Sequence, residues 1–118
     1  MIIEDHQLFR DGLKAMLGSR QDFSVVGEAA DGLTAVREIE RLKPDLVLLD
    51  LSIPKMSGIS VMKEIQRTVP DTKVMALTIH ESDQYVLEGS PAGMDAYGIK
   101  DASGDELTIA LESVVTVR

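Results

Sequence analysis

The amino-acid sequence predicts an α/β domain in which five parallel strands form one sheet with helices on both faces. Short apolar runs without polar alternation recur along the chain, and the clearest is residues 46–50, Leu-Val-Leu-Leu-Asp. Strands that are covered on both faces have this pattern. Between the runs, apolar residues recur every three or four positions, as in amphipathic helices. Strands that alternate with helices through short loops favour parallel pairing by right-handed crossovers.

Five segments have the composition of strands. They are residues 1–3, 23–29, 46–50, 73–78 and 97–100. The first is short for a buried strand, which suggests that further residues precede it. Four of the five strands end on or next to polar residues: Glu4 and Asp5 after the first, Asp50 in the third, Thr78 in the fourth and Lys100 in the fifth.

The segments between the strands have helical periodicity. Helices are expected over residues 7–17, after Asp31-Gly32, over 59–69, over 82–92 and after a capping box at 103–106, Ser-Gly-Asp-Glu. Gly89 and Pro91 interrupt the fourth of these helices. The residues expected to face the sheet are Phe9, Leu13, Met16 and Leu17, then Leu33, Val36, Ile39 and Leu42, then Ile59, Met62, Ile65 and Val69, and finally Leu107, Ala110, Leu111 and Val114.

Composition excludes several classes of protein. The 118 residues fit one domain, and aromatic residues make up only 3%, so the core must be aliphatic. The absence of cysteine removes disulfides and thiolate metal sites. A net charge of −8 argues against binding of a nucleic-acid backbone by this chain. No apolar run approaches the roughly 18 residues of a membrane span, so we expect a cytoplasmic domain without a membrane partner.

The usual order of strands in such a five-stranded sheet is 2-1-3-4-5, and ligands bind where the winding reverses, beyond strands one and three. Those two strands end at Glu4-Asp5 and at Asp50. Because the carboxyl ends of parallel strands share one edge, Thr78 and Lys100 are expected to lie nearby. A strand-end acid alone more often caps a loop, but together these residues predict a site.

The predicted site has the chemistry of magnesium-dependent phosphoryl transfer. Three carboxylates in one crevice need a counter-charge, which Mg²⁺ and a lysine can supply. Mg²⁺ commonly shares its site with phosphate. In this interpretation Asp50 attacks phosphorus, Lys100 neutralises phosphoryl oxygens, and Thr78 offers its hydroxyl group to one of them.

These residues resemble those of the response-regulator receiver domains of two-component systems, and within them the NarL/FixJ (LuxR-type) branch. The resemblance covers nearly the whole chain and implies a flavodoxin-like, doubly wound fold. It depends on residues 4–6 with 8–13, on 44–51, on Pro54 and Gly58, on Thr78, and on Tyr97 three positions before Lys100. Together these spacings are specific, although each alone is weak.

The resemblance implies a role for each site residue. Asp50 is the phosphoacceptor for a sensor histidine kinase, and Glu4, Asp5, Asp50 and the backbone carbonyl of Ser52 hold Mg²⁺. Lys100 pairs with the acyl phosphate, while Thr78 and Tyr97 form a switch that changes the surface formed by helix four, strand five and helix five. A signalling domain that is phosphorylated, rather than an enzyme, is therefore expected.

Partners follow from the same resemblance. Residues 1–118 are expected to be the receiver part of a longer transcriptional regulator that dimerises on activation and reaches DNA only through a helix-turn-helix domain absent from this chain. The chain departs from the family at Gly89, Pro91 and Gly98, so the output face is less typical than the phosphorylation site. Asp101 after Lys100 is usual for the NarL/FixJ branch.

Two alternative functions have different signatures. A phosphohydrolase with an aspartyl-phosphate intermediate usually has a second acid two residues after its nucleophile, and here that position is Ser52. A receiver-like interaction module without phosphorylation is expected to have an altered acid pair, acceptor or lysine, and this chain retains all of them.

Overall fold

The computed structural model describes residues 1–78, 94–100, 107 and 109–112, and it has the predicted architecture. One five-stranded sheet has the order β2-β1-β3-β4-β5, and all of its pairs are parallel. The predicted fold class and strand order are therefore confirmed. The strands are β1 (Ile2–Ile3), β2 (Glu28–Ala29), β3 (Leu46–Asp50), β4 (Lys73–Thr78) and β5 (Ala96–Ile99).

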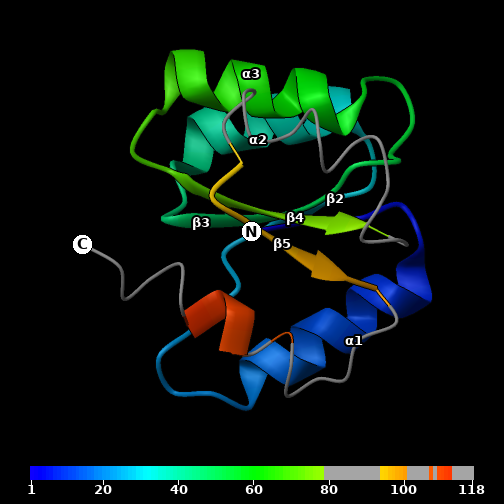
Figure 1. The fold of residues 1–118 in the computed structure, drawn as a ribbon, viewed down its shortest axis with the longest axis vertical. Helices are drawn as coiled ribbons and strands as arrows, with labels where there is room; N and C mark the ends of the chain where they lie inside the picture. Colours follow the sequence, from blue (N-terminus) through cyan, green and yellow to red (C-terminus); the bar gives the residue numbers. More distant parts are fainter. Residues whose placement is uncertain (79–93, 101–106, 108, 113–118) are drawn as a thin grey trace.

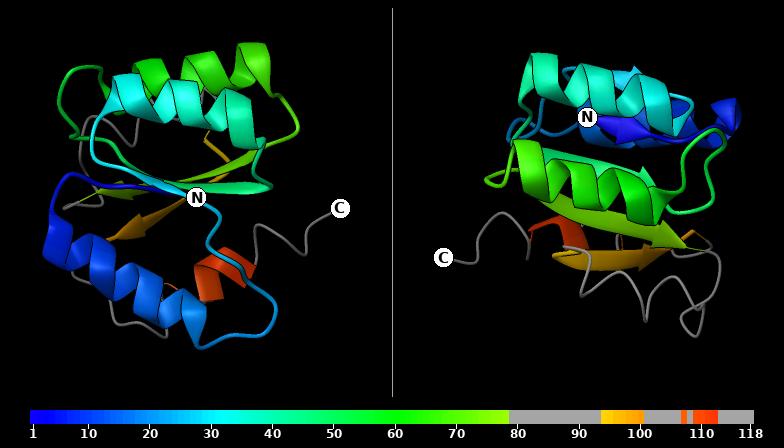
Figure 2. Two further views of the ribbon diagram at one scale, coloured as in Figure 1. Left: turned by 180° about the vertical axis from the view of Figure 1, so that it is seen from behind. Right: turned by 90° about the horizontal axis from the view of Figure 1, so that it is seen from above.

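The helices lie on both faces of the sheet. Helix α1 (Gln7–Gly18) covers one face, together with the helical residues 109–112. Helices α2 (Gly32–Leu42) and α3 (Gly58–Thr68) cover the other face (Figures 1 and 2). Among the helices in the described part of the chain, none is long and apolar enough to cross a membrane.

The pleat of the strands divides the core into two layers. Alternate strand residues, such as Met75 and Ala76, point to opposite faces because side chains of a strand alternate. Buried residues on the α2–α3 side include Ile3, Val47, Leu49, Val74 and Ala76. Those on the α1 side include Ile2, Leu48, Met75, Leu77, Leu107 and Leu111. This double burial explains why β3 and β4 are apolar along their length.

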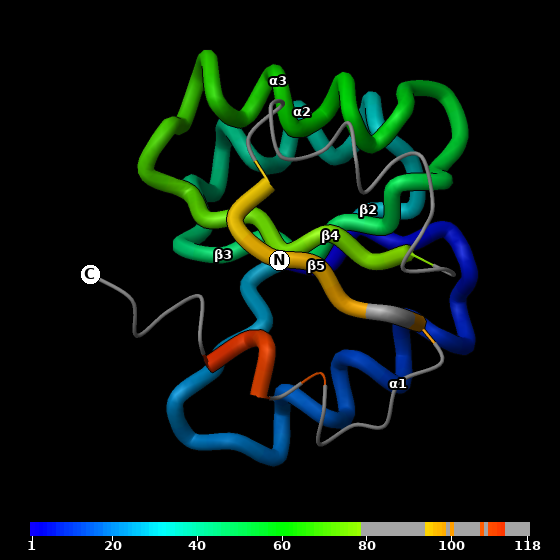
Figure 3. Tube along the Cα trace, in the orientation of Figure 1, coloured from blue at the N-terminus to red at the C-terminus, as the bar shows by residue number. Residues whose placement is uncertain are grey.

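The register of the sheet brings the strand ends to one edge. Ile3 is level with Leu49, so Glu4 follows β1 beside Asp50. Thr78 is level with Ile99, so Lys100 follows β5 beside the end of β4. The tube in Figure 3 shows β4 and β5 running side by side toward this edge. The polar residues predicted at the ends of four strands therefore share one edge of the sheet.

The second strand is shorter than predicted. Only Glu28–Ala29 of the expected segment 23–29 pairs with β1, because β1 itself has two residues and offers no further partners. The bounds of the other described strands agree with the predicted bounds within one residue. The N-terminal end of helix α1 also agrees with prediction.

Helix α2 corrects one residue of the predicted core. Leu33 is 52% exposed, whereas Ala35 and Ile39 are buried. Asp31 caps the helix by accepting a hydrogen bond from the Thr34 N–H, so the first turn begins at Gly32. The face toward the sheet then runs through Gly32, Ala35 and Ile39, and Leu33 points away from it.

Helix α3 begins at Gly58 and ends at Thr68, each one residue before the predicted bound, and Ser57 is its cap. Its buried face contains Val61 in addition to the predicted Met62 and Ile65. Leu107 and Leu111 are buried as expected. The predicted helix 82–92, the capping box 103–106 and Val114 lie outside the described residues.

Candidate functional site

Three side chains from three strand ends meet at the edge of the sheet. Lys100 Nζ lies 2.6 Å from Glu4 Oε1 and 3.0 Å from Asp50 Oδ2. Both acids are buried, with 0% and 3% of their surface exposed. Phe9 of α1 lies beside the lysine, with its ring centroid 5.1 Å from Nζ. A buried acid pair around one ammonium group is thus the centre of the site.

Main-chain hydrogen bonds extend the sheet as far as these residues. The Glu4 N–H donates to the Ala29 carbonyl at 3.0 Å, and the Lys100 N–H donates to the Thr78 carbonyl at 2.8 Å. Each charged residue therefore starts from backbone that is fixed by a neighbouring strand. Such fixed starting points restrict the positions that the carboxylate and ammonium groups can reach.

The loop after β3 holds the Asp50 carboxylate from its other side. The Ser52 N–H donates to Asp50 Oδ1 at 2.9 Å. The loop is attached to α2 because the Gly32 N–H donates to the Pro54 carbonyl at 3.1 Å. It returns to α3 at Gly58, where a Cβ atom would lie 2.6 Å from Leu51 Cα. Glycine at position 58 thus permits the close approach that shapes this loop.

The pKa of Glu4 is raised to about 7. Burial is the largest cause, followed by the neighbouring Asp50 carboxyl, and the contact with Lys100 opposes both. Near neutral pH, Glu4 is therefore a group that can release a proton when a second positive charge arrives.

Asp50 has the opposite shift. Burial raises its pKa, but interactions with Glu4, the Ser52 N–H and Lys100 outweigh burial, and the pKa is lowered from its ordinary value. For Lys100, burial lowers the pKa, but the contacts with Glu4 and Asp50 outweigh it, and the pKa is raised. Asp50 is thus ionised at neutral pH, and Lys100 is protonated.

The acidic residues have the arrangement of a cation site. One carboxylate oxygen from each of Glu4, Asp5 and Asp50 lies within 4.8 Å of the others. Apart from the ion pair between Glu4 Oε1 and Lys100, the carboxylate oxygens of buried Glu4 have no hydrogen-bond partner among the described residues. Asp5 is exposed, which leaves one side of the cluster open to water. Hard oxygen ligands and open positions for water fit Mg²⁺.

Thr78 and Tyr97 lie near one another in the sheet but differ in exposure. Thr78 ends β4 and is buried, whereas Tyr97 in β5 is 37% exposed. Tyr97 is level with Ala76, two residues before Thr78, so both point to the α2–α3 side of the sheet. The side chain of Tyr97 thus lies partly outside the core.

The packing around position 98 explains why glycine is found there, which the sequence alone did not show. A Cβ atom at this position would lie 2.6 Å from Met75 Cε and 2.8 Å from Leu107 Cδ2. These two side chains fill the space that a larger residue would need. The departure from the family at position 98 is therefore accommodated within the core on the α1 side.

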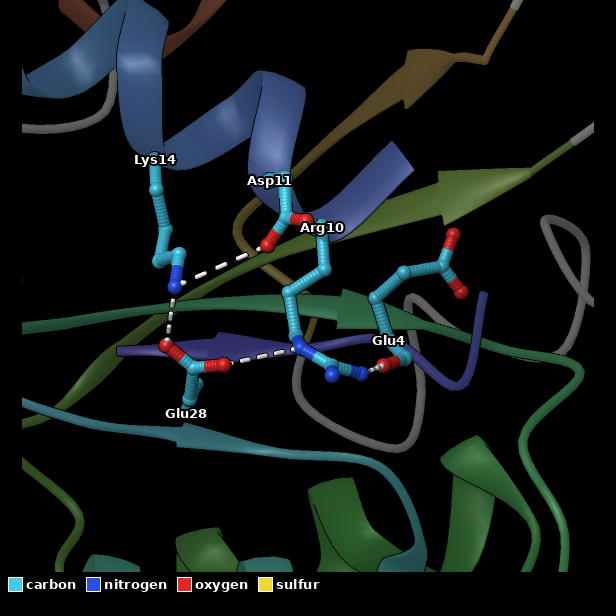
Figure 4. A network of polar contacts seen from close by, with 5 residues as sticks. All are labelled: Glu4, Arg10, Asp11, Lys14 and Glu28. Carbon is cyan, nitrogen blue, oxygen red and sulfur yellow. Dashed lines mark hydrogen bonds and ion pairs between the residues drawn. The ribbon is translucent and has the colours of Figure 1, made fainter. Parts of the chain in front are cut away.

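Sequence reasoning missed Arg10 as part of the site. Its Nη1 group donates to the main-chain carbonyl of Glu4 at 2.6 Å, and its Nε group donates to Glu28 Oε1 at 2.9 Å (Figure 4). Arg10 belongs to the segment 8–13 that carries the family resemblance. The position of Arg10 in the sequence does not indicate that its side chain binds the main-chain carbonyl of Glu4. That segment was the only available signal.

Comparison with known proteins now assigns the family. Residues 1–112 match the family described as "Response regulator receiver domain". The chain belongs to this family. It is therefore a signalling domain, as the sequence predicted. The transcriptional regulatory protein YhcZ of Bacillus subtilis (strain 168), which is described as uncharacterized, is 44% identical over 107 residues, or 91% of this chain and 50% of that protein.

Two solved structures support the same assignment. The receiver domain of the putative response regulator NarL from Mycobacterium tuberculosis has a TM-score of 0.89 and 29% identity, covering 98% of this chain and 94% of that one. The receiver domain of the sensor histidine kinase PA1611 from Pseudomonas aeruginosa PAO1 has a TM-score of 0.87 and 29% identity, covering 98% and 95%. That structure has a magnesium ion coordinated in its active-site cleft.

This receiver domain spans about half the length of the curated relatives it matches, with 50%, 48% and 54% of three of them covered. The resemblance to the NarL/FixJ (LuxR-type) branch is confirmed by these relatives, several of which are named as transcriptional regulatory proteins.

Proposed function

We propose that this receiver domain accepts a phosphoryl group on Asp50. The observation that carries the proposal is the buried, ionised Asp50 carboxylate, which the Ser52 N–H and Lys100 hold from two sides. In the forward step, an Asp50 oxygen forms a bond to phosphorus while the bond from phosphorus to the donor's leaving group breaks. Hydrolysis later transfers the phosphoryl group to water and restores the carboxylate.

Glu4, Asp5, Asp50 and the main-chain carbonyl of Ser52 would hold Mg²⁺ in this proposal. The three clustered acids support it, and so does the magnesium ion in the PA1611 receiver domain. When bound, the ion would neutralise negative charge on the phosphoryl group during transfer.

Lys100 and Thr78 would act on the phosphorylated state. The Lys100 ammonium group, now shared between Glu4 and Asp50, can pair with a phosphoryl oxygen on Asp50. The Thr78 hydroxyl group is buried at the neighbouring strand end and can donate a hydrogen bond to another oxygen. Movement of Thr78 would open space for Tyr97 to turn inward from its half-exposed position and so change the adjoining surface.

The whole regulator would connect a sensor histidine kinase to transcription. The kinase is inferred from membership of the family, and the transcriptional output from relatives such as DegU of Brevibacillus brevis, a transcriptional regulatory protein. A homodimer on activation and DNA binding through a separate helix-turn-helix domain complete the proposal. With 20 acidic against 12 basic residues, this chain alone is poorly suited to DNA.

The test is intact mass spectrometry after incubation with acetyl phosphate, with and without Mg²⁺. The parent chain should gain one phosphoryl group only when Mg²⁺ is present, with acetate as the leaving group. The matched control is Asp50→Asn, which keeps the size of the side chain but lacks the nucleophilic oxygen anion. A folded parent chain that stays unmodified, or an Asp50→Asn variant that is modified equally, would contradict the proposal.

A further inference from the structure

The Arg10 side chain connects α1 to the ends of two strands. It donates from Nη1 to the carbonyl of Glu4, directly after β1, at 2.6 Å and from Nε to Glu28 Oε1 on β2 at 2.9 Å. Only 14% of the side chain is exposed. The guanidinium group is planar and its donors have fixed directions, so two partners define its orientation.

The acceptor on Glu4 is a main-chain atom at the point where the chain leaves the sheet. The Glu4 N–H is the last on this strand to pair with β2, through the Ala29 carbonyl. The Glu4 carbonyl belongs to the peptide group that joins Glu4 to Asp5. A hydrogen bond from Arg10 therefore fixes the plane of this peptide group, and the plane sets the directions in which both carboxylates leave the chain.

Arg10 does not act as the counter-charge of the acid cluster. Figure 4 shows the Glu4 carboxylate directed away from the guanidinium group, whose contact with Glu4 is to its main-chain carbonyl oxygen. The charge of Arg10 is balanced by Glu28, and Glu28 also binds Lys14 Nζ at 2.8 Å. Because this charge is already paired, the effect of Arg10 on the cluster is mainly on geometry.

We propose that Arg10 is a positioning residue for the metal site, with Glu28 orienting its guanidinium group. This inference rests on the proposed Mg²⁺ site of Glu4, Asp5 and Asp50. Mg²⁺ tolerates little deviation from its preferred octahedral geometry, so misdirected carboxylates bind it poorly. Groups that orient metal ligands typically change metal affinity by about 10–100-fold when they are removed.

The experiment measures the Mg²⁺ dissociation constant by calorimetric titration at pH 8, and thermal unfolding without Mg²⁺ separately. Arg10→Met keeps an unbranched apolar stem and removes the donors, and we expect a dissociation constant about tenfold higher. The matched control is Arg67→Met, which removes an exposed ion pair with Glu64 on α3. This control should bind Mg²⁺ within about twofold of the parent chain.

Two further variants separate positioning from charge and from stability. Arg10→Lys keeps the positive charge but lacks the planar group, and it should also weaken binding. Glu28→Met removes the acceptor that orients the guanidinium group and should weaken binding in the same direction, whereas Lys14→Met should not. Because Glu28 lies at the surface, Glu28→Met decides the question even if Arg10→Met fails to fold.

The outcomes distinguish this inference from the proposed function. Unchanged or tighter Mg²⁺ binding by folded Arg10→Met, or by Glu28→Met, overturns the positioning role while leaving the metal site intact. Parent affinity in Arg10→Lys would assign the effect to charge and also overturn it. Absence of Mg²⁺ binding by the parent chain itself would overturn the metal site and, with it, the role of Arg10.

Discussion

The Lys100 ammonium group lies 3.0 Å from Asp50 Oδ2 and joins the end of β5 to the end of β3 across β4. The same group is 2.6 Å from Glu4 Oε1, so one cation balances two buried acids from strands far apart in the sequence. In the absence of metal, this contact gives the acid cluster its main compensation for burial.

Replacement of Lys100 by methionine should destabilise the domain. Two buried acids would then share a crevice without the cation, and we expect a loss of about 1–3 kcal/mol in the free energy of unfolding at pH 8. The loss should be smaller at pH 6, where Glu4 can take up a proton. Urea unfolding at both pH values measures it, with Lys63→Met on the exposed side of α3 as control. Equal losses in both variants would contradict the role of Lys100.

The raised pKa of Glu4 gives a direction to the pH dependence of stability. The pKa is about 7 in the folded chain and 4.5 in the reference state, so the folded chain holds the proton more tightly. The contribution of Glu4 to stability is therefore present below pH 4.5 and is lost as the pH rises toward 7. Urea unfolding of metal-free protein should show this decline, and Glu4→Gln should flatten it. A contribution that grows over this interval would show the opposite shift.

Mg²⁺ binding should strengthen over the same pH range. Binding favours the ionised form of Glu4, so protons compete with the metal and the affinity should rise as the pH passes through about 7. Calorimetric titration in two buffers of different ionisation enthalpy would show the released proton. An affinity that is independent of pH between 6 and 8 would exclude Glu4 as the coupled group.

Gly58 should be sensitive to the addition of one methyl group. The Cβ atom of Gly58→Ala would lie 2.6 Å from Leu51 Cα and 3.1 Å from the Asp50 carbonyl oxygen. Because backbone must move, we expect a loss of about 1–3 kcal/mol in unfolding free energy. Gly12→Ala is the matched control, because a Cβ atom there would have no neighbour within 4 Å beyond the adjoining backbone of α1. An unchanged midpoint of urea unfolding for Gly58→Ala would show that the loop can move to accept the methyl group without loss of stability.

The proposed switch can be followed by fluorescence, since the chain has no tryptophan. Tyr97→Trp places a reporter at the half-exposed position in β5, and its emission should shift to shorter wavelength on phosphorylation as the ring moves inward. With Thr78→Ala added, the phosphoryl group should still appear by mass but the shift should be lost. A shift that persists without the Thr78 hydroxyl group would separate Tyr97 from Thr78.

The fold was predictable because its strongest signals are local. The uniform run at 46–50 indicated a doubly covered strand, and periodic apolar residues on either side indicated crossovers. From these, the register of a parallel sheet brings Glu4, Asp50 and Lys100 together without further information. The two-residue length of β2 was not predictable, since it depends on how much of β1 is available as partner.

Other features depend on atoms that leave no pattern in the sequence. Leu33 fits the apolar period, yet the cap at Asp31 sets the rotation of α2 and leaves Leu33 exposed. Arg10 binds a main-chain carbonyl, which every residue has, so the identity of its partner carries no signal. The packing of Gly98 against Met75 and Leu107 likewise appears only in three dimensions.

The measurement that tests the central claim most directly is the chemical location of the phosphoryl group. Borohydride reduces an aspartyl phosphate to homoserine with loss of phosphate, and peptide mass spectrometry then identifies the modified residue. After reaction with acetyl phosphate and Mg²⁺, homoserine should appear at position 50 and nowhere else. Homoserine forms only from an aspartyl phosphate. Homoserine at Asp5 or at any other aspartate, or its absence from position 50, would contradict the assignment of Asp50 as phosphoacceptor.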